Sequence, residues 1–149
     1  MVSSNDECTL HTQRIFSASP EEVFAAFSDA EALSRWWGPE GFTNAFHVCD
    51  FVEGGRWEFD MLGPDGRRYA NVCVFEKLEQ DRTVVIRHVS APCFTLSITL
   101  TSYSGGTHLA WSQTFDDPKT AASFRRIAAP GNEQNLDRLQ RLLQDTQGN

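Results

Sequence analysis

The feature that most restricts the fold is a run of alternating apolar and polar residues from Phe42 to Phe115, interrupted at short intervals by turn sequences. Alternation with a period of two places successive side chains on opposite faces of a β-strand. The run therefore predicts six consecutive antiparallel strands joined by short turns. The turn sequences are Gly54-Gly55, Gly63-Pro64-Asp65-Gly66, the polar stretch 79–82 and Ser104-Gly105-Gly106.

One face of this predicted sheet is apolar and the other is polar. Trp57, Phe59 and Met61 alternate with charged residues, and the apolar residues from Phe94 to Leu100 alternate with Thr and Ser. An antiparallel sheet with this pattern exposes one face to water and has the other face covered. A helical segment elsewhere in the chain must therefore pack against the apolar face.

Helices are predicted on both sides of the strand run. After a first strand over residues 9–18, a helix begins at Pro20, because Ser19 and Glu22 match a capping box. A second short helix restarts at Asp29 and ends before Gly38.

The C-terminal part is predicted to be helical over residues 118–129 and 132–145, and Pro130-Gly131 forces a break or kink between them. Its second segment repeats leucines at helical spacing and turns Arg138, Arg141 and Asp145 toward water. The leucines expected to cover the sheet, against Phe94, Ile98 or Trp111, are Leu136, Leu139 and Leu143.

These elements predict an α+β fold of the order β-α-α-β6-α, with a curved seven-stranded antiparallel sheet around a long C-terminal helix. The 149 residues form a single domain, 1–149, in which about 1–8 and 146–149 are expected to be flexible. A curved sheet rich in inward-facing aromatic residues can leave a cavity between itself and the helix.

Charge and hydropathy exclude several kinds of partner. Thirteen Lys and Arg against twenty Asp and Glu give a net charge of -7, which repels nucleic acid and anionic membrane surfaces. The N-terminal residues lack the basic start and apolar run of a secretory signal, and no stretch is long enough to span a bilayer. We expect a soluble cytoplasmic protein, either a monomer or a homodimer, with no nucleic acid or membrane as partner.

The cysteines and histidines do not predict a metal site or a cofactor. Cys8, Cys49, Cys73 and Cys93 have no paired spacing, so they are expected to be reduced and mostly buried. His47 and Cys49 lie two apart on one predicted strand face, but two ligands do not make a site.

The adjacent tryptophans Trp36 and Trp37 have two interpretations. In one, one tryptophan fixes the second helix to the sheet and the other shields the rim of the fold. In the other, both tryptophans and Phe42 form one lip of a ligand cavity. The floor of that cavity would consist of Trp57, Phe59, Met61 and Trp111.

Polar residues on the predicted apolar face are further candidates for ligand contact. His88 shares a face with Val84 and Ile86, and Gln113 lies between Trp111 and Phe115 on another strand. Each is either a hydrogen-bonded core residue or a group that orients the polar part of a ligand. Tyr69 and Asn71 can join them, although the register of their strand is not settled by the pattern. For Arg14, a salt-bridged structural role is favoured over anion binding.

Catalytic motifs are absent from the sequence, and no catalytic residue is assigned. There is no phosphate-binding loop or nucleophile elbow, and the acidic pairs Glu21-Glu22 and Asp116-Asp117 are explained by helix capping. An enzyme built on this chain would have to use His88 or Tyr69 as a general acid or base.

Three stretches carry a family resemblance: RIFSASPEEVFAAFSDAEALSRWWGPEGF, DFVEGGRWEFDMLGPDG and NLDRLQRLL. They resemble homologues of the activator of the heat-shock-protein-90 ATPase, in the START-like SRPBCC superfamily that includes the birch-pollen-allergen fold. The similarity runs from about Arg14 to Leu143. It implies a helix-grip fold, whose relatives bind hydrophobic small molecules or lipids, serve as co-chaperone modules, or act as cyclases and hydratases.

Three functions follow from these observations and the resemblance. The preferred one is binding of a hydrophobic or aromatic small molecule in a cavity under the C-terminal helix. The alternatives are a protein-interaction module that stimulates a chaperone ATPase and a cavity enzyme of the cyclase or hydratase type.

Overall fold

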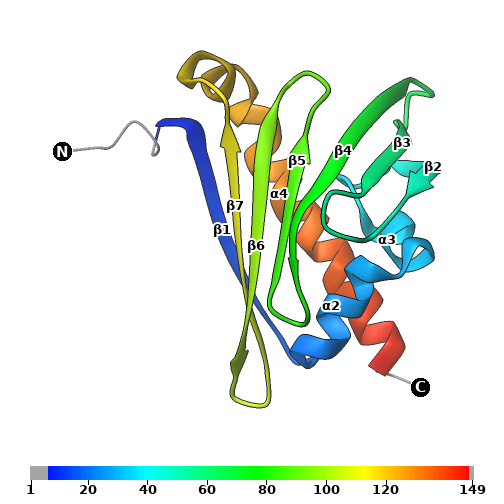
Figure 1. Cartoon of the computed structure of the whole chain (residues 1–149), viewed down its shortest axis with the longest axis vertical. Coiled ribbons are helices and arrows are strands. Elements are labelled where there is room, and N and C mark those ends of the chain that lie inside the picture. Colours follow the sequence, from blue (N-terminus) through cyan, green and yellow to red (C-terminus); the bar gives the residue numbers. More distant parts are fainter. Residues whose placement is uncertain (1–6, 148–149) are drawn as a thin grey trace.

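The seven strands form one antiparallel sheet with the order β1-β7-β6-β5-β4-β3-β2, in a computed structural model that describes residues 7–147. The predicted helix-grip architecture is confirmed, and Figure 1 shows the curved sheet on one side of the long helix α4. The elements are β1 (Thr9–Phe16), α2 (Pro20–Ser28), α3 (Ala30–Trp36), β2 (Thr43–Cys49), β3 (Arg56–Leu62), β4 (Arg68–Glu79), β5 (Thr83–His88), β6 (Phe94–Tyr103), β7 (Gly106–Phe115) and α4 (Pro118–Gln147).

The starts of the two short helices follow the predicted capping. The Ser19 hydroxyl accepts a hydrogen bond from the Glu22 amide at 3.2 Å, and the Glu22 carboxylate accepts one from the Ser19 amide at 3.2 Å. Asp29 ends α2 and caps α3, because its carboxylate accepts a hydrogen bond from the Glu31 amide at 3.0 Å. These local bonds satisfy amide groups that a helix start otherwise leaves without partners.

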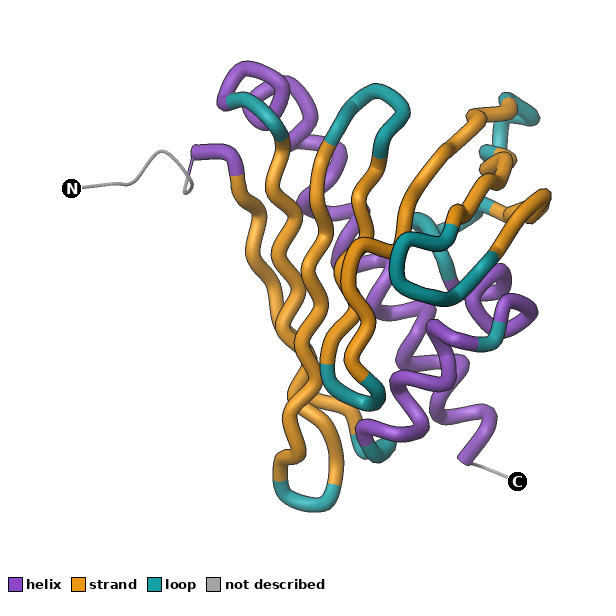
Figure 2. Tube along the Cα trace, viewed as in Figure 1, coloured by secondary structure: helices purple, strands orange, loops and turns teal. Residues whose placement is uncertain are grey.

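The sequence predicted helical segments over 118–129 and 132–145 with a break or kink between them, and of these alternatives the structure has the kink, within one continuous helix. One helix runs from Pro118 to Gln147 with Pro130 inside it, and Figures 1 and 2 show it changing direction near the top of the view. A proline bends a helix by removing one hydrogen bond and crowding the preceding turn. Each half of the helix packs against the rest of the protein, because Ala121 in the first half and Leu139 in the second are fully buried. This packing holds the helix together on both sides of the bend.

The core lies between the concave face of the sheet and the helices. The predicted helix–sheet packing is present, because the leucines of α4 belong to the same buried cluster as Ile98 and Trp111, and Phe94 packs against that cluster. The leucines are Leu136, Leu139 and Leu143.

The register of β4 resolves a point that the sequence left open. Tyr69 lies opposite Met61, and Asn71 lies opposite Phe59, so both residues belong to the concave face. A shift in the β4–β5 pairing between Phe75 and Lys77 changes the alternation further along β4, which explains why its pattern was ambiguous.

A second irregularity corrects the predicted pairing of His47 with Cys49. The β2–β3 register shifts between Phe46 and Val48, so Cys49 lies opposite Trp57 on the concave side. His47 instead contacts Asp60 at 3.0 Å, and its side chain is on the outer face. The two residues therefore lie on opposite faces, and no group of three or more metal-binding side chains occurs within residues 7–147.

The four cysteines are free thiols, as the spacing predicted. Cys8 and Cys73 are buried, and burial raises the pKa of Cys73 to about 12, which keeps it protonated.

Of the terminal segments expected to be flexible, residues 1–6 and 148–149 lie outside the described part of the chain. None of the helices described here has the length and apolar character needed to cross a bilayer.

Candidate ligand-binding site

An aromatic cluster centred on Trp37 fills the space between α3, the sheet and α4. The Trp37 ring lies 5.0 Å from the ring of Trp57, 5.4 Å from that of Trp36 and 6.0 Å from that of Trp111. Trp36 is 1% exposed and Trp37 is 8% exposed. The Trp36 indole N–H donates to the Ala26 carbonyl at 3.0 Å, which fixes α3 against α2. Both tryptophans of the pair therefore lie in the core, and neither forms an exposed lip.

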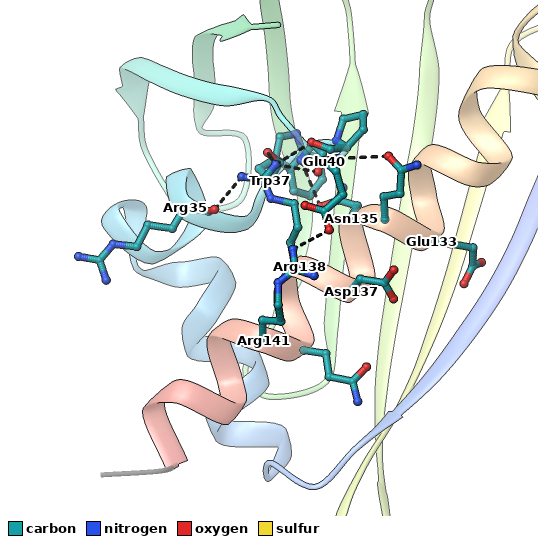
Figure 3. Close-up of polar contacts among 12 residues, drawn as sticks. Arg35, Trp37, Glu40, Glu133, Asn135, Asp137, Arg138 and Arg141 are labelled. Carbon is teal, nitrogen blue, oxygen red and sulfur yellow. Dashed lines mark hydrogen bonds and ion pairs between the residues drawn. The ribbon is translucent and has the colours of Figure 1, made fainter. Parts of the chain in front are cut away.

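The turn that carries Trp37 is held by a single arginine of α4 (Figure 3). Arg138 donates from Nη1 to the carbonyls of Trp37 at 3.0 Å, Gly38 at 2.9 Å and Pro39 at 2.9 Å. Its Nη2 donates to the Arg35 carbonyl at 2.8 Å. The last carbonyls of a helix lack partners within the helix, and the guanidinium supplies donors for them. The sequence had placed Arg138 toward water; the structure instead makes it the C-terminal clamp of α3.

Other polar contacts from α4 reinforce this clamp. The Gly38 amide donates to the Asn135 side-chain oxygen at 3.1 Å, and Gly38 has a φ of 95°, a conformation that glycine adopts without strain. One turn further along α4, Arg141 forms an ion pair with Glu40 of the same turn, with 2.6 Å between Nη2 and Oε2. Burial lowers the pKa of Arg138, but the guanidinium still titrates far above neutral pH.

Arg14 has the ion-paired role that the sequence favoured. It lies on β1 and reaches α4, where its Nη1 contacts Asp137 at 2.9 Å and its Nη2 contacts Glu133 at 3.1 Å. The Gln140 side-chain oxygen accepts a further hydrogen bond from Arg14 at 3.1 Å. These contacts fix the middle of α4 to the edge of the sheet.

The concave face is buried around Trp37 and more exposed at the end that carries Tyr69, which we call the open end. Tyr69 faces inward yet is 44% exposed, and its ring lies 6.2 Å from that of the half-buried Phe42. Met61, opposite Tyr69, is also half-buried. On the first half of α4, Ile127 is 70% exposed. Gly131, one turn after Ile127, faces Pro39, whose side chain lies 3.7 Å from the ideal Cβ position of Gly131.

His88 lies on the concave face, opposite Cys73 on one neighbouring strand and Phe94 on the other. Its Nδ1 lies 2.9 Å from the Pro92 carbonyl, its Nε2 lies 2.7 Å from the Asn71 side-chain oxygen, and its ring stacks on Phe94 at 4.6 Å. Burial lowers the pKa of His88, and the nearby charge of Arg87 lowers it further. Hydrogen bonds to backbone groups act in the opposite direction, because they favour the charged ring. A neutral imidazole has one N–H, so it can donate to only one of the two oxygens.

Gln113 is also hydrogen-bonded within the protein. Its side-chain oxygen accepts a bond from the Asn132 amide of α4 at 3.0 Å. Both predicted polar residues of the apolar face, His88 and Gln113, are therefore buried with partners, which fits a core role.

Three buried polar atoms within the described residues have no hydrogen-bond partner. They are the indole nitrogens of Trp57 and Trp111 and the side-chain oxygen of Asn44. The Asn44 amide donates to the carbonyls of Trp37 at 2.9 Å and Ser34 at 3.0 Å. All three residues therefore contact Trp37.

The sequence matches the family described as "Activator of Hsp90 ATPase homolog 1-like protein" over residues 17–144. The chain belongs to this family. A search of curated proteins finds no match. The AHSA1-like fold supports a small ligand-binding or activator-type domain.

Solved structures share this AHSA1-like fold. A protein from Chromobacterium violaceum is 27% identical, with a TM-score of 0.82 over 90% of this chain and 96% of that one. A protein from Arthrobacter aurescens is 19% identical, with a TM-score of 0.88 over 97% of this chain and 90% of that one. An AHSA1-like protein from Aeromonas hydrophila is 18% identical, with a TM-score of 0.75 over 93% of this chain and 94% of that one.

Within this AHSA1-like domain, the residues predicted to line one cavity fall into three groups. The first is the buried aromatic core, which also includes Phe59, stacked on Trp57 at 4.3 Å. The second is at the open end and comprises Phe42, Met61 and Tyr69. The third comprises the buried residues His88, Gln113 and Phe115, of which Phe115 packs in a separate cluster with Leu10 and Ala121. Asn44, Phe94 and Ile127 were not predicted, because their roles depend on contacts between distant segments. Surface hollows of about 350 and 270 Å³ lie at other turns and include none of the predicted residues.

Proposed function

We propose that this AHSA1-like domain binds a small apolar or aromatic molecule on the concave face of its sheet, beneath α4. The observation that carries the proposal is the exposure of Tyr69, which is 44% although the residue faces the covered side of the sheet. The half-buried Phe42 and Met61 beside it add apolar surface at the same end. A concave, mostly aromatic surface with few polar groups is typical of small-molecule sites.

The polar groups nearest this surface support a ligand with one polar end. Asn71 shares the concave face with Tyr69, and its side chain is bonded both to His88 and to the Tyr69 carbonyl at 3.0 Å. An amide that is already oriented by two bonds is a precise partner for a polar group of a ligand. Apolar contacts therefore supply most of the affinity, and Asn71 sets the orientation.

A neutral fluorescent probe, N-phenyl-1-naphthylamine, tests the proposal. We expect saturable binding at one site and a rise in melting temperature with probe concentration, because the probe binds only the folded state. Tyr69→Asp places a charge at the open end and should weaken binding at least tenfold. Tyr103→Asp is the matched control, since Tyr103 is 53% exposed on β6 and lies away from this end. Non-saturable binding, or equal weakening by both variants, would contradict the proposal.

Stimulation of a chaperone ATPase is the second candidate function, and the description of the family favours it. The measurement is ATP hydrolysis by Hsp90 with and without this protein. A several-fold rise that persists in Tyr69→Asp would support an activator that uses a surface other than the open end. An unchanged rate would exclude this candidate.

A further inference from the structure

The three unpartnered polar atoms belong to residues that lie next to Trp37. The rings of Trp57 and Trp111 lie 5.0 and 6.0 Å from the Trp37 ring, and the Asn44 side-chain amide donates to the Trp37 backbone carbonyl. The indole nitrogens of Trp57 and Trp111 are donors, and the side-chain oxygen of Asn44 is an acceptor. Buried polar groups in folded proteins are almost always hydrogen-bonded, so three exceptions in contact with one residue require a common explanation.

The attachment of Trp37 allows its ring to move separately from its backbone. Trp37 follows the last residue of α3, and its backbone carbonyl accepts hydrogen bonds from Arg138 and Asn44. Its indole nitrogen is not among the buried atoms without a partner, unlike those of Trp57 and Trp111. Of these three rings, Trp37 is the most exposed, at 8% against 0% and 1%. Because the turn is held through backbone carbonyls, a rotation of the Trp37 ring would leave the hydrogen bonds of the turn in place.

We infer that the Trp37 ring occupies a ligand position, and that the ligand is a small aromatic molecule bearing a hydroxyl group. This inference rests on the proposed function, extends its site from the open end into the aromatic core around Trp37, and names its ligand class. An aromatic ring replaces the contacts of the displaced indole with the flanking Trp57 and Trp111. A hydroxyl group both accepts and donates hydrogen bonds, so it matches indole donors and an amide oxygen acceptor. A purely apolar ligand leaves these three atoms unpaired.

Water has the same hydrogen-bonding chemistry as a hydroxyl group, so the experiment must separate the two. The probes are 2-naphthol and naphthalene, which share a ring system and differ in one hydroxyl. We expect the wild-type protein to bind 2-naphthol at least tenfold more tightly, measured by titration calorimetry. Equal affinities would overturn the inference, as would a crystal structure grown with 2-naphthol that shows only water at Trp57, Trp111 and Asn44.

Tryptophan-to-phenylalanine variants locate the donors. Trp57→Phe and Trp111→Phe remove an N–H and keep an aromatic ring, so each should reduce the preference for 2-naphthol several-fold. Trp36→Phe is the matched control, because the Trp36 indole already donates to Ala26 and should not contribute to the preference. A preference that is unchanged in Trp57→Phe and Trp111→Phe, or lost equally in Trp36→Phe, would overturn the inference.

A Trp37→Ala variant tests the ligand position without requiring the ring to be displaced. It should bind 2-naphthol at least tenfold more tightly than wild type; an unchanged affinity would overturn the inference.

Failure of the inference is distinguishable from failure of the proposed function. If N-phenyl-1-naphthylamine binds in a Tyr69-dependent way while 2-naphthol shows no preference over naphthalene, only the inference fails. If the wild type binds none of the probes, the proposed function fails and the inference fails with it, whatever Trp37→Ala binds.

Discussion

At the scale of single residues, Arg138 shows how one side chain can determine the position of a turn. Four backbone carbonyls accept hydrogen bonds from its guanidinium. We expect Arg138→Ala to lower the free energy of unfolding by at least about 2 kcal/mol, because several half-buried carbonyls lose a charged donor. Urea unfolding followed by circular dichroism measures this loss.

Arg141 provides the control for that prediction. It lies one turn further along α4 and makes an exposed ion pair with Glu40. Its replacement by alanine should cost less than about 1 kcal/mol, as is usual for exposed pairs. Arg138→Lys should fall between the two, since an ammonium group has three donors and lacks the planar fork. Equal losses for Arg138→Ala and Arg141→Ala would show that the clamp does not stabilise the fold.

His88 makes the stability depend on pH. Its folded-state pKa lies below the ordinary 6.5 because the ring is buried, so the unfolded chain takes up a proton at higher pH than the folded one. The stability from neutral His88 is therefore complete above about pH 6.5 and is lost as the pH falls toward the lower folded-state pKa.

The measurement is urea unfolding between pH 7.5 and 5 for wild type and His88→Gln. The wild type should lose more stability over this interval than the variant, which has no titrating group at position 88. The carboxyls of Asp60 and Asp116 have pKa values below the ordinary 3.8, because His47 and Arg68 donate to the first and Arg87 to the second. Their contribution is lost only at lower pH. Parallel pH profiles for the two proteins would refute the role of His88.

At the scale of elements, the two halves of α4 should contribute differently to stability. Leu139 in the second half is fully buried, and Ile127 in the first half is 70% exposed. Leu139→Ala should lower the free energy of unfolding by about 2 to 5 kcal/mol, because it removes buried apolar atoms and leaves a cavity. Ile127→Ala should change it by less than about 0.5 kcal/mol. Similar effects in chemical denaturation would mean that α4 does not pack on the sheet as described.

The order of the elements could be predicted from local signals, whereas the details of the site could not. The capping box at Ser19 and the glycine-rich turns act over a few residues, so the sequence displays them directly. The contact between Arg138 and the carbonyls of residues 35–39 joins segments about a hundred positions apart. Nothing near Arg138 in the sequence distinguishes it from a water-facing helical arginine. The strand bulges have the same difficulty, because the partner strand determines where the register shifts.

At the scale of the whole molecule, the burial of all four tryptophans gives a global probe of folding. Trp36, Trp37, Trp57 and Trp111 are each at most 8% exposed and belong to one core cluster. We expect native emission at short wavelength that resists quenching by acrylamide, and a red shift that coincides with the loss of circular dichroism on unfolding. Emission typical of exposed indole in the native protein would contradict the packing around Trp37.

The clamp on the turn after α3 also has a consequence for behaviour at high ionic strength. Arg138 is held by neutral carbonyl dipoles, whereas Arg14 and Arg141 are held by carboxylates of α4 and the turn. At about 1 M salt the screening length falls to about 3 Å, so exposed charge pairs lose most of their attraction. A half-buried charge surrounded by dipoles is screened far less. Concentrated salt should therefore weaken the pair of Arg141 with Glu40, whose side chains are 57% and 44% exposed, while the contacts of Arg138 stay in place, so that neighbouring turns of the same helix respond differently to one change of solvent.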